Sequence, residues 1–326
     1  MNEDIKHNKA KNSIKIWPYL DDISQAIVPY SDSHLSQNKD MVVNLDFSAV
    51  KKINSSGAVI LLSKLITTLK GKAHRFKIVL PENENITNYL QNSGFFAIIE
   101  NNLSITKNDL FNTVEIQTQT KPYIDEKQNV RTISFPIFHL KYDENNDRAC
   151  VDEFSDWITD IIIDYILKCN IQKNTFLSVL KEIAKNSQDH TMADAYFGFD
   201  IIENLGSNTG EICFAFSDLG IGITKNVKEN LPENSSYKRA KGKFSYSDAY
   251  HFAFTLGNTT SKYPRNKGIG MSMIMDGSKM LNLDLTIWDG RSMLFVPKEI
   301  SHSELRRNVF DTSNPVGFYY YGRLKF

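Results

Sequence analysis

Four side chains that could act together on a ligand recur along one predicted helix, residues 176–190. Glu182, Asn186, Asp189 and His190 stand at offsets of zero, four, seven and eight. On an α-helix, those offsets place all four near one edge. A carboxylate, an amide and a second carboxylate in such a row can orient a water molecule and hold a metal ion. An ordinary solvated helix face could have the same residues.

A single carboxylate follows a strongly apolar segment further along the chain. Asp218 comes directly after this segment, residues 212–217. Burial of a carboxylate in such surroundings is costly without a partner, and an amine on a ligand is a natural partner. Gly220 and Gly222 allow a tight turn with no Cβ beside that ligand. Asp-x-Gly-x-Gly is also a generic turn sequence, so this motif is weak evidence on its own.

Four short motifs follow one another in an order that resembles the Bergerat ATP-binding fold. They are Glu182-Ile-Ala-Lys-Asn186, Phe216-Ser-Asp-Leu-Gly-Ile-Gly-Ile223, Gly257-Asn-Thr-Thr-Ser-Lys262 and Asn266-Lys-Gly-Ile-Gly-Met-Ser272. Each motif is weak evidence alone, whereas all of them in order are strong evidence. The fold defines the family of gyrase, heat-shock chaperone, histidine-kinase and mismatch-repair ATPases. The chain is similar to this family from about residue 150 to its last residue.

This resemblance implies a role for each residue of the first motif. Asn186 would bind Mg²⁺ through its amide oxygen, while nucleotide phosphates and water supply the other ligands. Glu182 would orient or deprotonate the attacking group, which is water in an ATPase and a serine hydroxyl in a kinase. Asp189 matches the aspartate of the chaperone-type motif, and His190 matches the histidine of anti-sigma serine kinases. The helix therefore has features of both subfamilies.

The resemblance also implies contacts to the adenine and the phosphates. Asp218 would accept a hydrogen bond from the adenine amino group, beside Gly220 and Gly222, and residues 224–266 would form a lid over ATP. Lysine, asparagine, serine and glycine dominate this lid up to residue 244, which favours a mobile loop. The predicted phosphate contacts are hydroxyls (Thr259, Thr260), cations (Lys262, Arg265, Lys267) and free N–H groups at the start of a helix (Gly268, Gly270). For the three cations, a solvated basic loop is the alternative.

Hydrophobic periodicity predicts the elements that must position these residues. In the C-terminal part, helices are predicted at 151–167, 176–190, 247–256 and 269–281, and strands at 196–202, 211–216, 283–288, 291–296 and 315–326. These elements imply an α/β sandwich, with a mixed sheet covered on one face by helices. In the connecting segment, a strand is predicted at 131–141. In the N-terminal part, strands are predicted at 41–47, 76–80 and 95–99, and helices at 58–69 and 83–91. This alternation implies βαβ units.

The N-terminal elements resemble the STAS domain of anti-sigma-factor antagonists over roughly residues 35–100. The resemblance lies in a strand, the turn Ile53-Asn-Ser-Ser-Gly57 and an apolar helix. In that family the second serine of the turn is phosphorylated, which indicates Ser56 as a phosphoacceptor. Asn54 stands where the family usually has aspartate. Alternatively, Ser55 or Ser56 caps the following helix by accepting a backbone N–H hydrogen bond.

The chain is long enough for two domains with separate cores, since it has 326 residues. We predict a STAS-like domain at 1–105, a connecting segment or edge strands at 106–140, and an ATP-binding domain at 141–326. The formal net charge is zero, so nucleic acid is not indicated. No signal peptide or membrane span is predicted. Three cysteines without metal-ligand spacing favour free thiols in a cytoplasmic protein.

Two functions from different classes fit these patterns. The first is a regulatory ATPase or protein serine kinase in a STAS partner-switch pathway, with ATP and Mg²⁺ as cofactors. Its substrate would be Ser56 or a serine on a separate STAS partner. The second is an ATP-driven conformational or dimerisation switch without phosphotransfer, and a module that only senses nucleotide is a third option. His139, the nearest upstream histidine, lies on a predicted strand, which argues against a histidine kinase.

Overall fold

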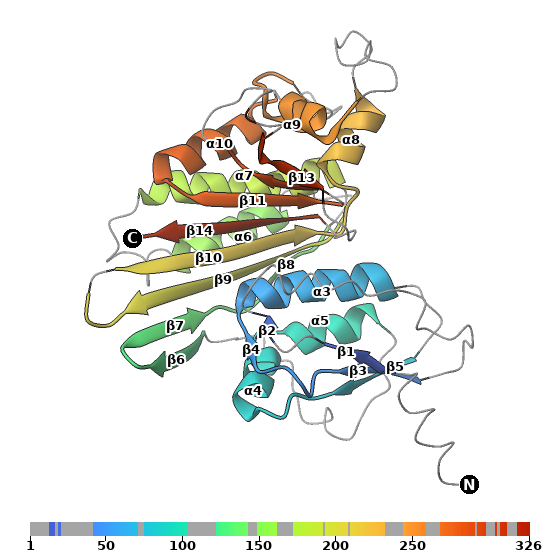
Figure 1. The fold of residues 1–326 in the computed structure, drawn as a ribbon, viewed down its shortest axis with the longest axis vertical. Coiled ribbons are helices and arrows are strands. Elements are labelled where there is room, and N and C mark those ends of the chain that lie inside the picture. The colour runs from blue at the N-terminus through green and yellow to red at the C-terminus, as the bar shows by residue number, and fades with distance from the viewer. Residues whose placement is uncertain are drawn as a thin grey trace. The chain divides into compact units, whose positions relative to one another are not determined.

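The computed structural model of the chain describes residues 13–16, 19–20, 42–70, 75–103, 122–142, 149–161, 172–191, 193–207, 209–231, 244–258, 268–290, 292–297, 304, 307–311 and 318–326. The chain falls into two compact units (Figure 1). Unit 1 comprises Met1–Asp125, Ile133–Ile137 and Gly198–Asp200. Unit 2 comprises Glu126–Thr132, Phe138–Phe197 and Ile201–Phe326. The segment 106–140, predicted as a connector, contributes residues to both units.

Unit 1 combines short parallel strands with helices. Strands β1 (Ser13–Lys15), β3 (Val42–Asp46) and β5 (Arg75–Val79) form a parallel sheet in the order β1-β3-β5. Strand β2 (Tyr19–Leu20) pairs in parallel with β4 (Lys52–Ile53). The helices are α3 (Ser55–Leu69), α4 (Glu84–Asn92) and α5 (Phe95–Asn102). Parallel neighbours need a crossover connection, so this pairing agrees with the predicted βαβ units.

Residues 95–99 belong to α5, so the strand predicted there is wrong. Gly94 has a positive φ of 80° between α4 and α5, which lets the chain turn sharply into the second helix. Phe95 and Phe96 are buried, and each contacts Phe47 edge-to-face at a centroid distance of 5.7 Å. These contacts with Phe47, the residue after β3, outweigh the local preference of phenylalanine and isoleucine for extended structure.

The large sheet has the strand order β13-β12-β11-β14-β10-β9-β7-β6, with β8 paired to β9. Its strands are β6 (Tyr123–Lys127), β7 (Val130–Ser134), β8 (Phe138–Leu140), β9 (Ala195–Asn204), β10 (Gly210–Asp218), β11 (Asp284–Asp289), β12 (Ser292–Phe295), β13 (Val309–Asp311) and β14 (Phe318–Lys325). The strand predicted at 131–141 is thus divided into β7 and β8, with Pro136 between them.

The strand pairs with a described register are antiparallel, whereas we predicted a mixed sheet. These pairs are β8–β9, β10–β14, β11–β14, β11–β12 and β12–β13. Short turns such as Asp289-Gly290 can join only antiparallel neighbours, and Gly290 has the positive φ, 60°, that a tight hairpin turn requires. The final strand, β14, lies between β10 and β11 in the middle of the sheet.

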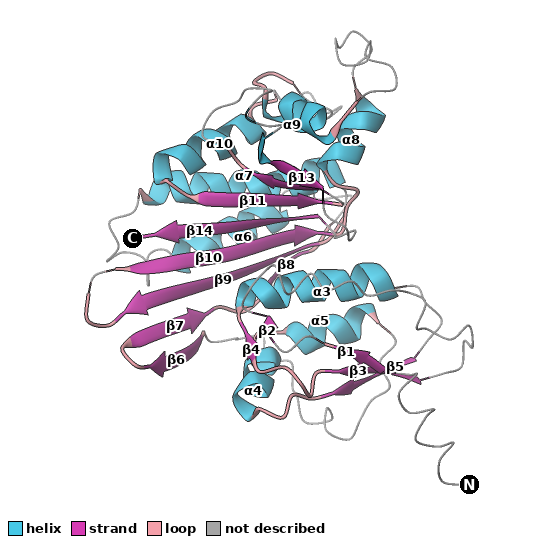
Figure 2. Ribbon diagram, in the orientation of Figure 1, coloured by secondary structure: helices cyan, strands magenta, loops and turns pink. Residues whose placement is uncertain are grey.

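Three helices of unit 2 cover one face of this sheet, as Figure 2 shows. They are α6 (Ala149–Ile161), α7 (Lys173–Thr191) and α10 (Gly270–Leu281), and α7 packs against both of the others. Phe176 of α7 contacts Phe214 of β10 at a centroid distance of 6.0 Å. The apolar stripe of α7 therefore faces the sheet, and the opposite edge remains available for polar side chains. The predicted end of α6, residues 162–167, lies outside the described residues.

Two more helices lie between the second and third predicted motifs. Helix α8 (Ile223–Asn230) forms within a segment predicted to be a loop, and α9 (Tyr246–Phe254) forms close to its predicted position. Val227 of α8 and Ala249 and Phe252 of α9 are buried in one cluster. This mutual burial explains why a polar segment is helical, because the few apolar residues of α8 fall on the face that meets α9.

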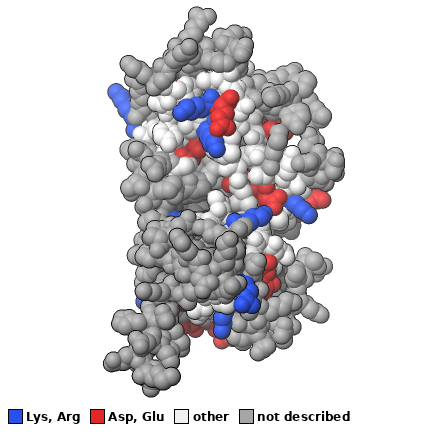
Figure 3. All heavy atoms as spheres, turned by 90° about the vertical axis from the view of Figure 1, so that its right-hand side faces the viewer, with Lys and Arg blue, Asp and Glu red and all other residues white. Residues whose placement is uncertain are grey.

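The surface shows no segregation of charge on the face drawn in Figure 3, where described acidic and basic side chains lie beside one another. No helix in the described ranges is long and apolar enough to span a membrane.

Candidate functional site

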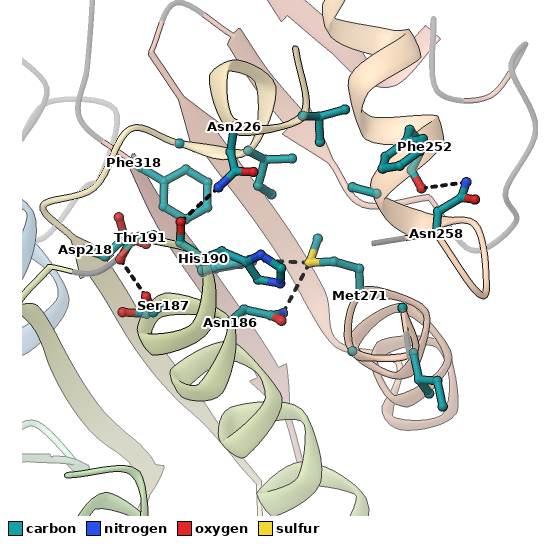
Figure 4. Close-up of a pocket in the computed structure, with 18 residues that line it drawn as sticks. Asn186, Ser187, His190, Thr191, Asp218, Asn226, Phe252, Asn258, Met271 and Phe318 are labelled. Atoms are coloured by element: carbon teal, nitrogen blue, oxygen red, sulfur yellow. Dashed lines mark hydrogen bonds between the residues drawn. The ribbon is translucent and has the colours of Figure 1, made fainter. Parts of the chain in front are cut away.

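One cavity in unit 2 brings together residues from the predicted motifs (Figure 4). It opens to solvent. The predicted residues that line it are Asn186 and His190 of α7, Asp218 at the end of β10, Gly222 before α8, and Gly268 and Gly270 at the start of α10. Segments far apart in the sequence thus meet around one space.

Three predicted residues are described but do not line this cavity. Glu182 lies next to it, because a Cβ on Gly270 would be 2.9 Å from Glu182 Oε2 and 3.0 Å from Asn186 Oδ1. Asp189 is half-buried on α7 outside the lining. Gly220 instead packs against α7, where an added Cβ would lie 2.2 Å from Thr191 Cβ. The other predicted contacts, Thr259, Thr260, Lys262, Arg265 and Lys267, lie outside the described residues.

Asp218 is a buried carboxylate in the wall of the cavity, with 3 % of its surface exposed. The Gly220 N–H donates to its Oδ1 at 2.9 Å. The pKa of Asp218 is raised from 3.8 to about 7, because the effects of burial and of the nearby Asp289 carboxylate, which raise it, outweigh that of the Gly220 hydrogen bond, which lowers it. An amine that donated to Asp218 would offset the cost of burying this charge.

Two polar atoms in the cavity wall have no hydrogen-bond partner among the described residues. They are Ser187 Oγ and Asn226 Oδ1, and both are buried. The amide of Asn226 is oriented by its Nδ2, which donates to the His190 carbonyl at 2.8 Å. Unsatisfied buried polar atoms are costly, so these two atoms fit a polar ligand or ordered water. Ser187 could have been inferred from its place beside Asn186, but no sequence signal indicated Asn226.

Asn186 is oriented by a side chain that the sequence did not indicate. Its Nδ2 donates to Met271 Sδ at 3.4 Å, and Tyr320 donates its hydroxyl to the same sulfur at 3.5 Å. The Asn186 Oδ1 remains on the side of Gly270, where it could bind a hard cation. Among the described residues, no group of three or more His, Cys, Asp and Glu side chains could hold a metal ion.

The polar edge of α7 also contains a cation beside the predicted base. Lys185 Nζ lies 3.4 Å from Glu182 Oε1, one helical turn away, and it can hold that carboxylate in place. His190 is further along the same edge. Burial lowers the pKa of His190, the Asp189 charge raises it and the Lys185 charge lowers it. Because its pKa is lowered, the His190 side chain that lines the cavity is favoured in its neutral form at neutral pH.

Ser56, the predicted phosphoacceptor, belongs to unit 1 and is only 2 % exposed. Its Oγ is buried and has no partner among the described residues. The predicted capping role of Ser55 or Ser56 is wrong, because Asn54 Oδ1 accepts the Gly57 N–H at 2.8 Å. The Ser55 and Ser56 N–H groups instead donate to the two carboxylate oxygens of Asp200, at 3.1 and 3.3 Å. A kinase could reach Ser56 only if this end of α3 opened.

Gly198→Ala is expected to destabilise unit 1, because α3 begins in close contact with β9. A Cβ at position 198 would lie 2.4 Å from the Ser55 carbonyl oxygen and 2.8 Å from Val59 Cγ2. Overpacking of this kind costs about 1–3 kcal/mol. Urea unfolding would measure the loss, with Gly206→Ala as the matched control, since a Cβ there meets nothing within 4 Å. Equal stability of the two variants would contradict the close approach of α3 to β9.

Comparison with known proteins identifies no relative for this site. No protein-family model, curated protein or solved structure matches the chain.

Proposed function

We propose that unit 2 binds Mg-ATP in this cavity and either hydrolyses it or transfers its γ-phosphate to a protein serine in a STAS partner-switch pathway. One observation carries this proposal. The buried Asp218 carboxylate and the Asn186 amide line the same cavity, and the amino end of α10 lies beside Asn186. A hydrogen-bond acceptor for a base, a ligand for a cation and an anion-binding helix terminus are the three elements that Mg-ATP requires.

The end of the cavity at Asp218 suits a flat base with an exocyclic amine. The cavity as a whole has apolar walls, which include Phe318 and Tyr320 of β14, Val227 of α8 and Phe252 of α9. Pockets for small molecules usually combine such walls with a few polar groups that fix the orientation of the ligand. Asp218 and the unpartnered Asn226 Oδ1 are acceptors, which matches the donor character of an adenine amino group.

The other end of the cavity suits phosphates. Helix α10 starts at Gly270, so its first N–H groups lack partners within the helix, and the helix dipole attracts anions there. Gly270 leaves space beside Glu182 and Asn186 that a Cβ would fill. Bound Mg²⁺ would neutralise phosphate charge, with Asn186 Oδ1 as its protein ligand. Glu182, held by Lys185, would then accept the proton of the attacking hydroxyl or water.

The burial of Ser56 bears on the choice of substrate. Its hydroxyl is enclosed in unit 1, so a serine on a separate STAS partner is the preferred acceptor. The alternative is an ATP-driven conformational or dimerisation switch without phosphotransfer. One observation favours this alternative: helices α8 and α9 both contribute residues to the cavity wall. Closure of these helices on ATP would change the shape of unit 2 and could pair two copies of the chain.

The proposal is tested by calorimetry of Mg-ATP with the full chain, followed by intact mass after incubation with ATP. Binding is expected for the wild type, and its absence would contradict the proposed function. Phosphate added to the chain or to a supplied STAS protein would support a kinase. Free phosphate with unmodified protein would support an ATPase, and binding without turnover would support the switch.

Asn186→Ala is expected to remove the gain in ATP affinity that Mg²⁺ provides. The substitution deletes the proposed amide ligand, and loss of a bond to a charged group weakens binding about 10- to 100-fold. Calorimetry with and without Mg²⁺ measures this gain. Asn174→Ala is the control, because Asn174 is an exposed residue on the same helix. An Mg²⁺ effect that persists in Asn186→Ala would sink the assignment of the metal ligand.

A further inference from the structure

Asp289 and Asp218 stand level with each other on two strands that flank β14. The antiparallel register aligns Phe318 of β14 with Asp218 of β10 on one side and with Asp289 of β11 on the other. Directly opposed residues of antiparallel strands point to the same face of a sheet. Both carboxylates therefore share a face with Phe318, which lines the cavity. Asp289 is 4 % exposed and is not one of the residues of the lining.

Asp289 caps a helix that begins elsewhere in the sequence. Helix α8 has Gly222 at its N-cap, which offers no side chain. Instead, both the N–H and the Oγ1 of Thr224 donate to Asp289 Oδ2, each at 2.6 Å. A carboxylate that accepts an N–H in the first turn satisfies one of the unpaired donors of the helix and stabilises its dipole. Asp289 thus supplies, from β11, the cap that α8 lacks.

Gly222 explains how this carboxylate approaches so closely. Its φ is +80°, and a Cβ there would lie 2.1 Å from Asp289 Oδ1. Only glycine adopts this conformation readily, and only glycine leaves room for the carboxylate. Gly222 is itself part of the cavity lining, so the backbone turn lies between Asp289 and the ligand space.

We propose that Asp289 is a positioning residue for the base-binding end of the cavity: it fixes the start of α8 beside Asp218, the carboxylate that would contact the ligand. This inference rests on the proposed function, because it assigns the ligand contact to Asp218. The start of α8 supplies Ile223, Asn226 and Val227 to the cavity wall. Loss of the Asp289 cap would therefore move this part of the cavity wall, and the surroundings of Asp218 would change with it.

The charge of Asp289 acts on the same contact. Asp289 is among the groups that raise the pKa of Asp218, after burial itself. Burial also raises the pKa of Asp289, while its two bonds from Thr224 lower it. The other titratable groups that face the pair are Tyr250 of α9 and Tyr320 of β14, whose pKa values burial and the nearby carboxylates raise, and His190 of α7, whose pKa burial lowers. Burial favours the neutral form of each of these three groups.

A direction of pH dependence follows for the ligand. An amine donates more strongly to an ionised carboxylate than to a protonated one. ATP affinity should therefore increase as the pH rises through the range in which Asp218 loses its proton, at about 7. Removing the negative charge of Asp289 lowers the pKa of Asp218, which moves this rise in affinity to lower pH.

The experiment measures the dissociation constant of Mg-ATP by calorimetry on the full chain, from about pH 5.5 to about pH 8.5. Wild type, Asp289→Asn and the control Asp284→Asn are compared, since Asp284 is exposed on the same strand. In Asp289→Asn, we expect a midpoint at lower pH and a plateau affinity weakened about 3- to 10-fold by the poorer cap. A merely structural role would weaken binding equally at each pH. An unmoved midpoint would overturn the inference.

Two further measurements distinguish a failure of the positioning role from a failure of the proposed function. Thr224→Val keeps the charge of Asp289 and removes only the hydroxyl donor, so it remains informative if Asp289→Asn does not fold. It should weaken ATP binding about 3- to 10-fold, and unchanged affinity would contradict the positioning role. Failure of the wild type to bind ATP at about pH 8, where Asp218 is ionised, would contradict the proposed function itself and the inference with it.

Discussion

Asp218→Asn is expected to weaken ATP binding strongly and, at the same time, to stabilise the nucleotide-free protein above neutral pH. The carboxylate is buried, and its pKa is raised from 3.8 to about 7. The asparagine amide places a donor where the ligand amine needs an acceptor, which should weaken binding about 100-fold or more. Without ligand, the substitution removes a charge that the fold has to bury.

The sign of the stability effect follows from the raised pKa. In the unfolded chain Asp218 ionises near its ordinary pKa, whereas in the folded chain it holds its proton up to about 7. The wild type therefore loses stability as the pH rises between these two values. Asparagine does not ionise, so the advantage of the variant should grow by about 2–3 kcal/mol between about pH 5 and about pH 8.

Urea unfolding at the two pH values, combined with calorimetry of ATP binding, measures both effects. Asp276→Asn is the matched control, because Asp276 is exposed on α10, and it should change neither quantity. Unchanged ATP affinity in Asp218→Asn would show that this carboxylate does not contact the base. A stability difference independent of pH would show that Asp218 has an ordinary pKa in the folded protein.

Glu182→Gln is expected to bind Mg-ATP normally and to lose turnover by about 10²–10⁴-fold, the usual cost of removing a general base. Glu182 lies beside the cavity rather than in its lining, and its carboxylate faces the start of α10. Glutamine keeps the size of the side chain but cannot accept a proton from water or from a serine hydroxyl. Binding and chemistry should therefore separate in this variant.

Phosphate release at saturating ATP, together with the dissociation constant, tests this separation. Glu229→Gln is the control, because Glu229 is exposed on α8 and forms a 3.9 Å surface ion pair with Lys225. Wild-type turnover in Glu182→Gln would exclude Glu182 as the base. Loss of ATP binding in this variant would instead place Glu182 among the binding residues.

The sequence by itself determined the elements with strong internal periodicity and the residues that those elements align. Helix α7 formed close to its predicted bounds, and its polar edge placed Asn186 and His190 in one cavity. Four-residue spacing on a helix fixes the relative position of two side chains without any help from the rest of the chain. Glycine before a helix is similarly local, which explains why Gly222 and Gly268 were found.

Only the tertiary structure decided which side chains form hydrogen bonds with residues from distant segments of the chain. Thr224 and Asp289 are 65 positions apart, and Ser55 and Asp200 are 145 positions apart. No periodicity relates such pairs, because their proximity depends on strand order: β14, the final strand, lies between β10 and β11 and sets Asp218 and Asp289 at the same level. The burial of Ser56 and the helical state of residues 95–99 have the same origin. Long-range packing determined both outcomes, whereas the local sequence supported a different reading.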